Sequence, residues 1–201
     1  KASIKTRLKN TSMYNLYRYM RCIFFILYKV FVIKKHFSSF EFEEKRDYTM
    51  VSIFMLQSSI QNNCFRDRYF MGIENYLTPQ KKKDLVFCPT FYKIKDYQQL
   101  IKDMNACDTA FIIPEFYLNI SDLLYVFSFP LRLKRLKFKL PIIFKGEDIS
   151  YLFRMDLLNS RFNRSSWQGI IKYRFINQLS KYPFNLKRLL AWFENQSHDK
   201  G

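Results

Sequence analysis

The feature that most constrains the fold is a series of short apolar segments separated by stretches with helical spacing. The first segment, at 84–89, reads Asp-Leu-Val-Phe-Cys-Pro and lies between a lysine cluster and a proline. Short apolar strands that alternate with helices are typical of a parallel sheet buried on both faces. The sequence therefore predicts an α/β fold with a parallel sheet covered by helices. The predicted strands are 84–89, 109–114, 141–144 and 186–191, and the predicted helices are 96–105, 123–129, 149–158 and 167–179.

Residues 1–50 differ from the rest because they combine a basic, aromatic helical stretch with a charged linker at 41–48. The predicted helix at 14–33 is interrupted by Arg18, Arg21 and Lys29, which share one side at 100° per residue. Its longest uninterrupted apolar run, 22–28, is far below the ~20 residues that cross a bilayer. We therefore predict a basic amphipathic extension at 1–50, followed by the α/β domain at 51–201.

Two interpretations of the amphipathic extension remain open. In the first, the helix lies in a membrane interface, with Phe24, Leu27 and Phe31 in the acyl boundary. Arg18, Arg21 and Lys29 would then contact an anionic membrane surface. In the second, it is an ordinary packed helix with a solvated basic edge.

The composition narrows the classes of partner. The net charge of +17 favours a polyanionic partner, namely nucleic acid, an anionic membrane or a phosphorylated substrate, although lysine enrichment alone also raises the charge. With only four glycines, the sequence contains no Gly-rich phosphate-binding loop. The four scattered cysteines are expected to be buried free thiols in the cytoplasm. Metal-ligand spacings of Cys, His or Asp are also missing, so no metal site is predicted.

Candidate site residues follow each predicted strand, where parallel sheets bind their ligands. Three carboxylates are candidate general bases, with Glu194 preferred over Asp148 and Glu115. Two of them have a structural alternative, since Asp148, like Asp122, fits a helix cap and Glu194 fits a cap or a salt bridge to Lys200. The candidate substrate-binding residues are Thr90, Tyr92, Lys145, Asn195, Gln196 and Lys200.

From about Ser58 to Gly201 the chain resembles bacterial surface-carbohydrate glycosyltransferases of the type with two Rossmann-like domains (GT-B). Trp192-Phe-Glu-Asn-Gln196 with Asp199-Lys-Gly201 carries most of the resemblance. The other matching motifs are Asp67-Arg-Tyr-Phe70, Phe87-x-Pro-Thr-Phe-Tyr92, Ile113-Pro-Glu115, Ile120-Ser-Asp122, Phe144-x-Gly-x-Asp-Ile149 and Tyr173-Arg-Phe175.

The resemblance implies a Rossmann-like amino-terminal, acceptor-side domain and a carboxyl-terminal donor domain outside this sequence. The chain would then be an incomplete and by itself inactive part of a transferase. It implies transfer of a sugar from a nucleotide-sugar, used as co-substrate with no further cofactor, to a glycan acceptor that is commonly lipid-linked. Glu194 to Gln196 would lie at the interdomain cleft. The expected location is cytoplasmic, peripheral on the inner face of the membrane.

The alternative function is a noncatalytic basic module that binds nucleic acid or an anionic membrane. The basic runs at 81–83 and 132–139 could track phosphates. Nucleic acid is the weaker of the two partners, because most aromatic residues fall in predicted core segments and no nucleic-acid-reading motif is present.

Overall fold

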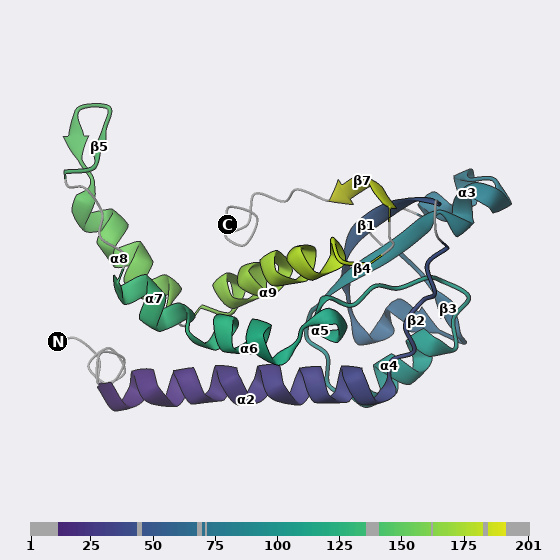
Figure 1. Ribbon diagram of the computed structural model, residues 1–201, viewed down its shortest axis with the longest axis horizontal. Helices are drawn as coiled ribbons and strands as arrows, with labels where there is room; N and C mark the ends of the chain where they lie inside the picture. Colours follow the sequence, from purple (N-terminus) through teal and green to yellow (C-terminus); the bar gives the residue numbers. More distant parts are fainter. Residues whose placement is uncertain are drawn as a thin grey trace.

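The computed structural model describes residues 12–43, 46–67, 70, 72–135, 141–161, 163–182 and 185–191. Within these residues the fold is mixed α/β, with a parallel three-stranded sheet flanked by helices (Figure 1). No helix of the described part is long and apolar enough to cross a membrane.

The sheet has the strand order β4 (Leu85–Phe91), β1 (Asp47–Met55), β7 (Asn185–Ala191), and all pairs are parallel. The structure confirms the predicted strands 84–89 and 186–191 as β4 and β7. The central strand β1 begins at Asp47, so the predicted domain boundary at residue 50 falls inside it. The segment 41–48, predicted as linker, therefore leads directly into the middle of the sheet.

The predicted strand 109–114 forms only a single bridge beside β4. The Phe87 amide donates to the Ala110 carbonyl, and the Ile112 amide donates to the Phe87 carbonyl, both at 2.9 Å. The chain then turns at Pro114 into the short helix α5 (Pro114–Tyr117), which ends the pairing. This edge segment nevertheless runs parallel to β4, on the side away from β1.

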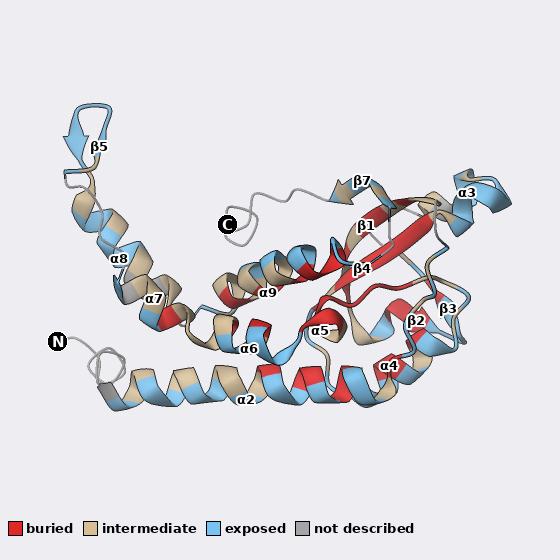
Figure 2. Cartoon of the chain, in the orientation of Figure 1, coloured by how far each residue is buried: buried red, intermediate tan, exposed pale blue. Residues whose placement is uncertain are grey.

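Alternating side chains of β1 point to opposite faces of the sheet, and each face is covered by helices (Figures 1 and 2). Val51 and Ile53 pack in one core with residues of α2 (Ser12–His36) and α4 (Tyr97–Asn105). Met50 packs in a second core with residues of α5 and α9 (Arg164–Leu179). The predicted helices 96–105 and 167–179 are thus confirmed.

A third core lies beyond the end of the sheet and joins three helices. Ile26 and Val30 of α2 pack there with Val126 of α6 (Ile120–Phe127) and with Trp167 and Ile171 of α9. The extension predicted at 14–33 is therefore one long helix that is attached to the body along much of its length.

The predicted parallel strand 141–144 is wrong. Its residues form an exposed antiparallel hairpin of β5 (Ile143–Phe144) and β6 (Glu147–Asp148), away from the sheet (Figure 1). Both residues of the tight turn have positive φ, 50° at Lys145 and 87° at Gly146, which is the geometry that joins antiparallel strands. The hairpin leads into α8 (Ser150–Ser160), the predicted helix 149–158.

The remaining elements are short and surround the edges of the body. They are the 3-10 helices η1 (Gln57–Ser59) and η2 (Ile73–Tyr76), the hairpin of β2 (Ile60–Gln61) and β3 (Cys64–Phe65), and the helices α3 (Pro79–Lys83) and α7 (Phe129–Arg135). In α7, Pro130 is the second residue, a position where the missing N–H of proline costs no helical hydrogen bond.

Candidate functional site

The carboxyl edge of the sheet is defined by the ends of the parallel strands. Met55, the last residue of β1, pairs with Phe91, the last residue of β4. On the other side of β1, Ala191 at the end of β7 pairs with Ser52. Since all three strands run in the same direction, their last residues all lie at the same edge of the sheet. This is where a parallel sheet of this kind binds ligands.

Tyr92 is presented to solvent at this edge. Its amide donates to the Met55 carbonyl at 2.9 Å, which extends the β4–β1 pairing by one residue, while half of the residue remains exposed. The next residue, Lys93, has a φ of 51°, and its Nζ lies 5.0 Å from the centre of the Tyr92 ring. Thr90, opposite Phe54, is half-buried just inside the same edge. Thr90, inside β4, and Tyr92, directly after it, therefore lie together at this edge, and their substrate-binding role stays a prediction.

Glu115 lies deeper and is engaged in a buried ion pair. Its Oε1 accepts a hydrogen bond from Nζ of Lys29 in α2, and both side chains are almost completely buried. Nζ of Lys29 also lies 4.7 Å from the centre of the Phe91 ring. A solvent-facing general base needs an open approach for the acceptor hydroxyl. The buried position of Glu115 therefore does not suit the predicted catalytic role. Its ion pair instead joins α2 to α5.

The same ion pair corrects the predicted role of Lys29. Sequence spacing placed Lys29 on a basic stripe with Arg18 and Arg21, facing an anionic membrane. In the structure Lys29 points into the body, between α2 and α5, while Arg21 is exposed and Arg18 is half-buried. Lys29 is therefore unable to meet lipid headgroups in this fold.

Lys145 and Asp148 lie on the β5–β6 hairpin and not at the carboxyl edge of the sheet. Both are exposed. The Asp148 carboxylate accepts a hydrogen bond from the Ser150 amide at 2.8 Å, at the start of α8. Hydrogen bonds from the Ser150 side chain and amide hold the pKa of Asp148 below its usual range. The N-cap of α8 is Ile149, so Asp148 accepts from the first helical amide from one residue before the cap position. The predicted meeting of Lys145 and Asp148 with Thr90 and Tyr92 is wrong.

Asp122 closes a capping box at the start of α6. Asn119 is the N-cap and accepts from the Asp122 amide at 2.9 Å, and Asp122 accepts in turn from the Asn119 amide at 3.0 Å. Arg174 and Gln178 of α9 donate to the same carboxylate at 2.7 and 2.6 Å. Burial alone would raise the pKa of Asp122, but the three donors outweigh it and lower the pKa. Asp122 therefore has a structural role at the start of α6, but as the third helical residue of the capping box, and the N-cap itself is Asn119.

The predicted residues Glu194, Asn195, Gln196 and Lys200 lie outside the described residues. Among the residues that are described, no group of three or more His, Cys, Asp or Glu side chains could hold a metal ion.

Among the described residues, two cavities have linings that include neither Thr90 nor Tyr92. One, of about 340 Å³, lies between α2 and the start of α9 and is lined by Arg18, Arg21 and Trp167 among others. The other, of about 390 Å³, lies near the amino ends of β1 and β4, between Asp47 and Lys81. Parallel sheets bind ligands at the opposite edge, so we do not assign the second cavity to the candidate site.

Sequence reasoning missed the buried ion pair of Lys29 and Glu115, whereas the apolar side of α2 was one of its two open interpretations. The partners Lys29 and Glu115 are 86 residues apart, so no local pattern links them. The surface of α2 had a visible signal in the apolar residues at 24, 27 and 31, which lie on the side of the helix away from Lys29. No family model, curated protein or solved structure matches this chain.

Proposed function

We propose that this chain is the acceptor-side part of a glycosyltransferase, which transfers a sugar from a nucleotide-sugar to a surface-glycan acceptor on the cytoplasmic side of the membrane. The observation that carries the proposal is the strand arrangement. With the edge segment at 110–112 included, the order is edge segment, β4, β1, β7, or 3-2-1-4 in order along the chain. The first four strands of a Rossmann-type sheet, whose full order is 3-2-1-4-5-6, follow the same order, and this agreement supports the proposal.

The residues around the carboxyl edge suit a hydroxyl-bearing acceptor. Tyr92 offers an exposed aromatic face and a hydroxyl, Thr90 offers a second hydroxyl, and Lys93 adds an exposed positive charge beside them. Aromatic faces and hydrogen-bonding groups are the elements with which proteins hold polar ligands of defined shape. This supports an acceptor site at the ends of β1 and β4.

The catalytic base in this proposal is Glu194. Asp148 and Glu115 lie in other environments, and Glu194 follows the end of β7 by three residues in the sequence. Its carboxylate would take the proton of the acceptor hydroxyl as the oxygen bonds to the anomeric carbon and the nucleoside diphosphate leaves with the bonding pair. Asn195 and Gln196 would orient the acceptor, and Lys200 would neutralise the departing phosphate.

The proposal is tested by measuring release of nucleoside diphosphate from a panel of nucleotide-sugars, with the protein expressed from its complete gene and a lipid-linked glycan extract as acceptor. One nucleotide-sugar should be consumed in an acceptor-dependent way. Tyr92→Ala should raise the KM for acceptor about tenfold, the effect of roughly 1.4 kcal/mol of lost binding. Tyr76→Ala is the matched control, since Tyr76 is exposed on η2, away from the carboxyl edge.

Absence of turnover with every nucleotide-sugar would favour the alternative, a noncatalytic basic module. Arg132, within the basic run considered for phosphate tracking, is already engaged. It donates to the Tyr125 carbonyl at 2.7 Å, and its guanidinium carbon lies 3.4 Å from the centre of the Tyr125 ring. This engagement makes Arg132 a poorer contact for phosphates, which argues against nucleic acid as the partner of that module.

A further inference from the structure

The outer face of α2 is an apolar surface along most of the helix. We define this α2 outer face by eight large apolar side chains that recur every three or four residues and are all exposed. Phe24 and Phe31 are 63% and 64% exposed. At 1.5 Å per residue the face is about 27 Å long. Exposed apolar surfaces of this extent mark interaction sites in soluble proteins. Its members are Met13, Leu16, Tyr17, Met20, Phe24, Leu27, Tyr28 and Phe31.

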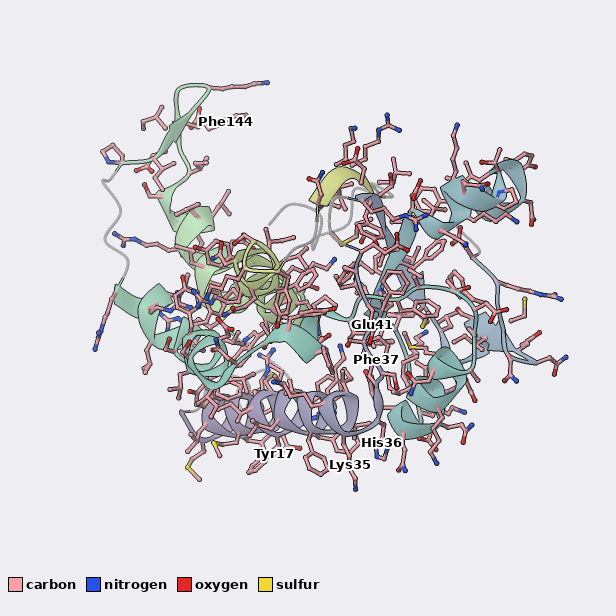
Figure 3. The ribbon with its side chains drawn as sticks, turned by 45° about the vertical axis from the view of Figure 1, so that its right-hand side comes forward. Tyr17, Lys35, His36, Phe37, Glu41 and Phe144 are labelled. Atoms are coloured by element: carbon pink, nitrogen blue, oxygen red, sulfur yellow. The ribbon has the colours of Figure 1, made fainter. Side chains whose placement is uncertain are left out.

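The opposite side of α2 fixes the orientation of this face. Ile26 and Val30 are buried against α6 and α9, and Ile33 is buried in the core that contains β1 and α4. The helix is therefore held to the body on one side and shows its other side to solvent. Figure 2 shows this division along α2, and Figure 3 shows Tyr17 and Lys35 on the side away from the body.

The charges of α2 have a single sign. The helix contains no Asp or Glu between Ser12 and His36. Arg21, Lys34 and Lys35 are exposed beside the apolar residues, and the last turn carries Lys34, Lys35 and His36. Of the two α2 cations on the opposite side, Arg18 is half-buried and Lys29 is paired with Glu115. The α2 outer face is thus apolar, and every charge that α2 itself places beside it is positive.

We propose that the α2 outer face docks on the surface of an anionic lipid bilayer, parallel to the membrane plane. Phe24, Leu27 and Phe31 enter the acyl boundary, and Arg21, Lys34 and Lys35 meet the headgroup phosphates. An apolar face with a basic border is the pattern of helices that lie in the interface. This docking does not depend on sugar transfer, and it holds the body at the membrane whatever reaction the sheet edge performs.

The cavity between α2 and α9 extends this surface on one side. Tyr17 belongs both to the α2 outer face and to the cavity wall, so the two are continuous. Arg18 and Arg21 also line the cavity, and the ring of Tyr14 lies 5.9 Å from the Arg18 guanidinium carbon. A headgroup phosphate of the docked bilayer would meet both guanidinium groups there.

A second copy of the chain is the other partner that could bind to an apolar helix face. Packing two α2 helices face to face would place only cationic charges around the apolar contact, because neither helix carries a carboxylate between Ser12 and His36. Juxtaposed like charges cost several kcal/mol in an interface. An anionic bilayer supplies the missing negative charge, so the charge pattern favours the bilayer.

The test is co-sedimentation of the protein with vesicles of phosphatidylcholine alone or of equal parts phosphatidylcholine and phosphatidylglycerol, without any nucleotide-sugar. Wild type should bind the anionic vesicles and release from them as salt screens the charges. Phe24→Gln with Phe31→Gln should weaken binding about 100-fold, because burial of both rings is lost. Arg21→Gln with Lys35→Gln should weaken it about 30-fold.

Matched controls distinguish binding through the α2 outer face from nonspecific adsorption to the vesicles. Tyr76→Gln with Tyr151→Gln removes two exposed aromatic rings on η2 and α8, and Lys81→Gln with Lys82→Gln removes two exposed lysines on α3. Both control pairs should bind like wild type, and circular dichroism should show equal helix content in all variants.

The proposal is overturned if wild type fails to bind anionic vesicles, or if the Phe24/Phe31 variant binds them as well as wild type does. It is also overturned if sedimentation shows a wild-type dimer that the same variant converts to a monomer, because the second copy would then be the occupant. A wild type that binds vesicles but turns over no nucleotide-sugar would support the docking and contradict only the proposed function.

Discussion

Nζ of Lys29 in α2 donates a hydrogen bond to Oε1 of Glu115 in α5, and both side chains are buried. Oε2 of Glu115 accepts no hydrogen bond from the described residues. Taking two charges out of water is costly, and the cost is offset only while both partners remain. The pair therefore fixes how α2 is seated on the body, and so also which side of α2 faces outward.

Replacing only one residue of the Lys29–Glu115 pair should lower the free energy of unfolding far more than replacing both. Lys29→Met leaves Glu115 as an uncompensated buried charge, and the free energy of unfolding should fall by about 3–5 kcal/mol. Lys29→Met with Glu115→Leu should recover most of this loss, as measured by urea unfolding. Lys34→Met is the control, since Lys34 is exposed on the same helix and should change stability by less than about 0.5 kcal/mol. A double variant as unstable as the single would contradict the pairing.

Asp122 should contribute to stability above acidic pH. Its folded pKa is lowered, so the contribution is fully present above the unfolded pKa of about 3.9 and is lost as the pH falls through the folded pKa. Asp122→Asn should lower the free energy of unfolding near neutral pH by roughly 2–3 kcal/mol, because charged hydrogen bonds from Arg174 and Gln178 are weakened.

The measurement is urea unfolding of wild type and Asp122→Asn between pH values near neutral and below the unfolded pKa. The difference in the free energy of unfolding between the two proteins should become smaller as the pH falls. Asp156→Asn removes an exposed carboxylate on α8 and should leave the wild-type curve unchanged. A gap of constant size at every pH would show that the variant disturbs packing and not the ionised network.

The four cysteines should react with thiol reagents in an order set by exposure and ionisation. All four are free, but only Cys88 is buried, whereas Cys64 is exposed, so the prediction of buried thiols holds for one of them. Burial raises the pKa of Cys88 to about 12 and that of Cys107 to about 11. The thiolate is the reactive form.

Timed alkylation of the native protein, read by peptide mass spectrometry, should therefore label Cys64 first and Cys88 last. Labelling of Cys107 should rise as the pH approaches about 11. Cys64→Ser removes the fast phase and serves as the control. Rapid labelling of Cys88 in the folded protein would contradict the packing of β4 in the second core.

Parts of the fold with long, self-consistent patterns could be predicted from the sequence. β4 and α4 were predicted to within two residues, because a strand of seven mostly apolar residues is followed by Asp96, which caps the helix through the Gln99 amide at 2.9 Å. The hairpin at 143–148 could not be told from a parallel strand. Four apolar residues fit either structure, and the Lys145-Gly146 turn was the only local signal for reversal.

Only the part of the candidate site that lies at the end of a predicted strand could be predicted from the sequence. Thr90 and Tyr92 follow from the position of β4, a local property of the sequence. Glu115 looked equivalent, but its environment is set by Lys29 from a helix 86 residues earlier, and that pairing decides that the carboxylate is buried. Long-range contacts of this kind are invisible to periodicity and composition.

In the proposed function, the protein transfers a sugar and Glu194 is its general base. The direct measurement is kcat for nucleoside diphosphate release by the protein from its complete gene, compared among wild type, Glu194→Gln and Glu147→Gln. Loss of a general base should lower kcat of Glu194→Gln by a factor of about 100 or more, and Glu147→Gln, on the exposed hairpin, should match wild type. Equal kcat values for Glu194→Gln and wild type would contradict the account.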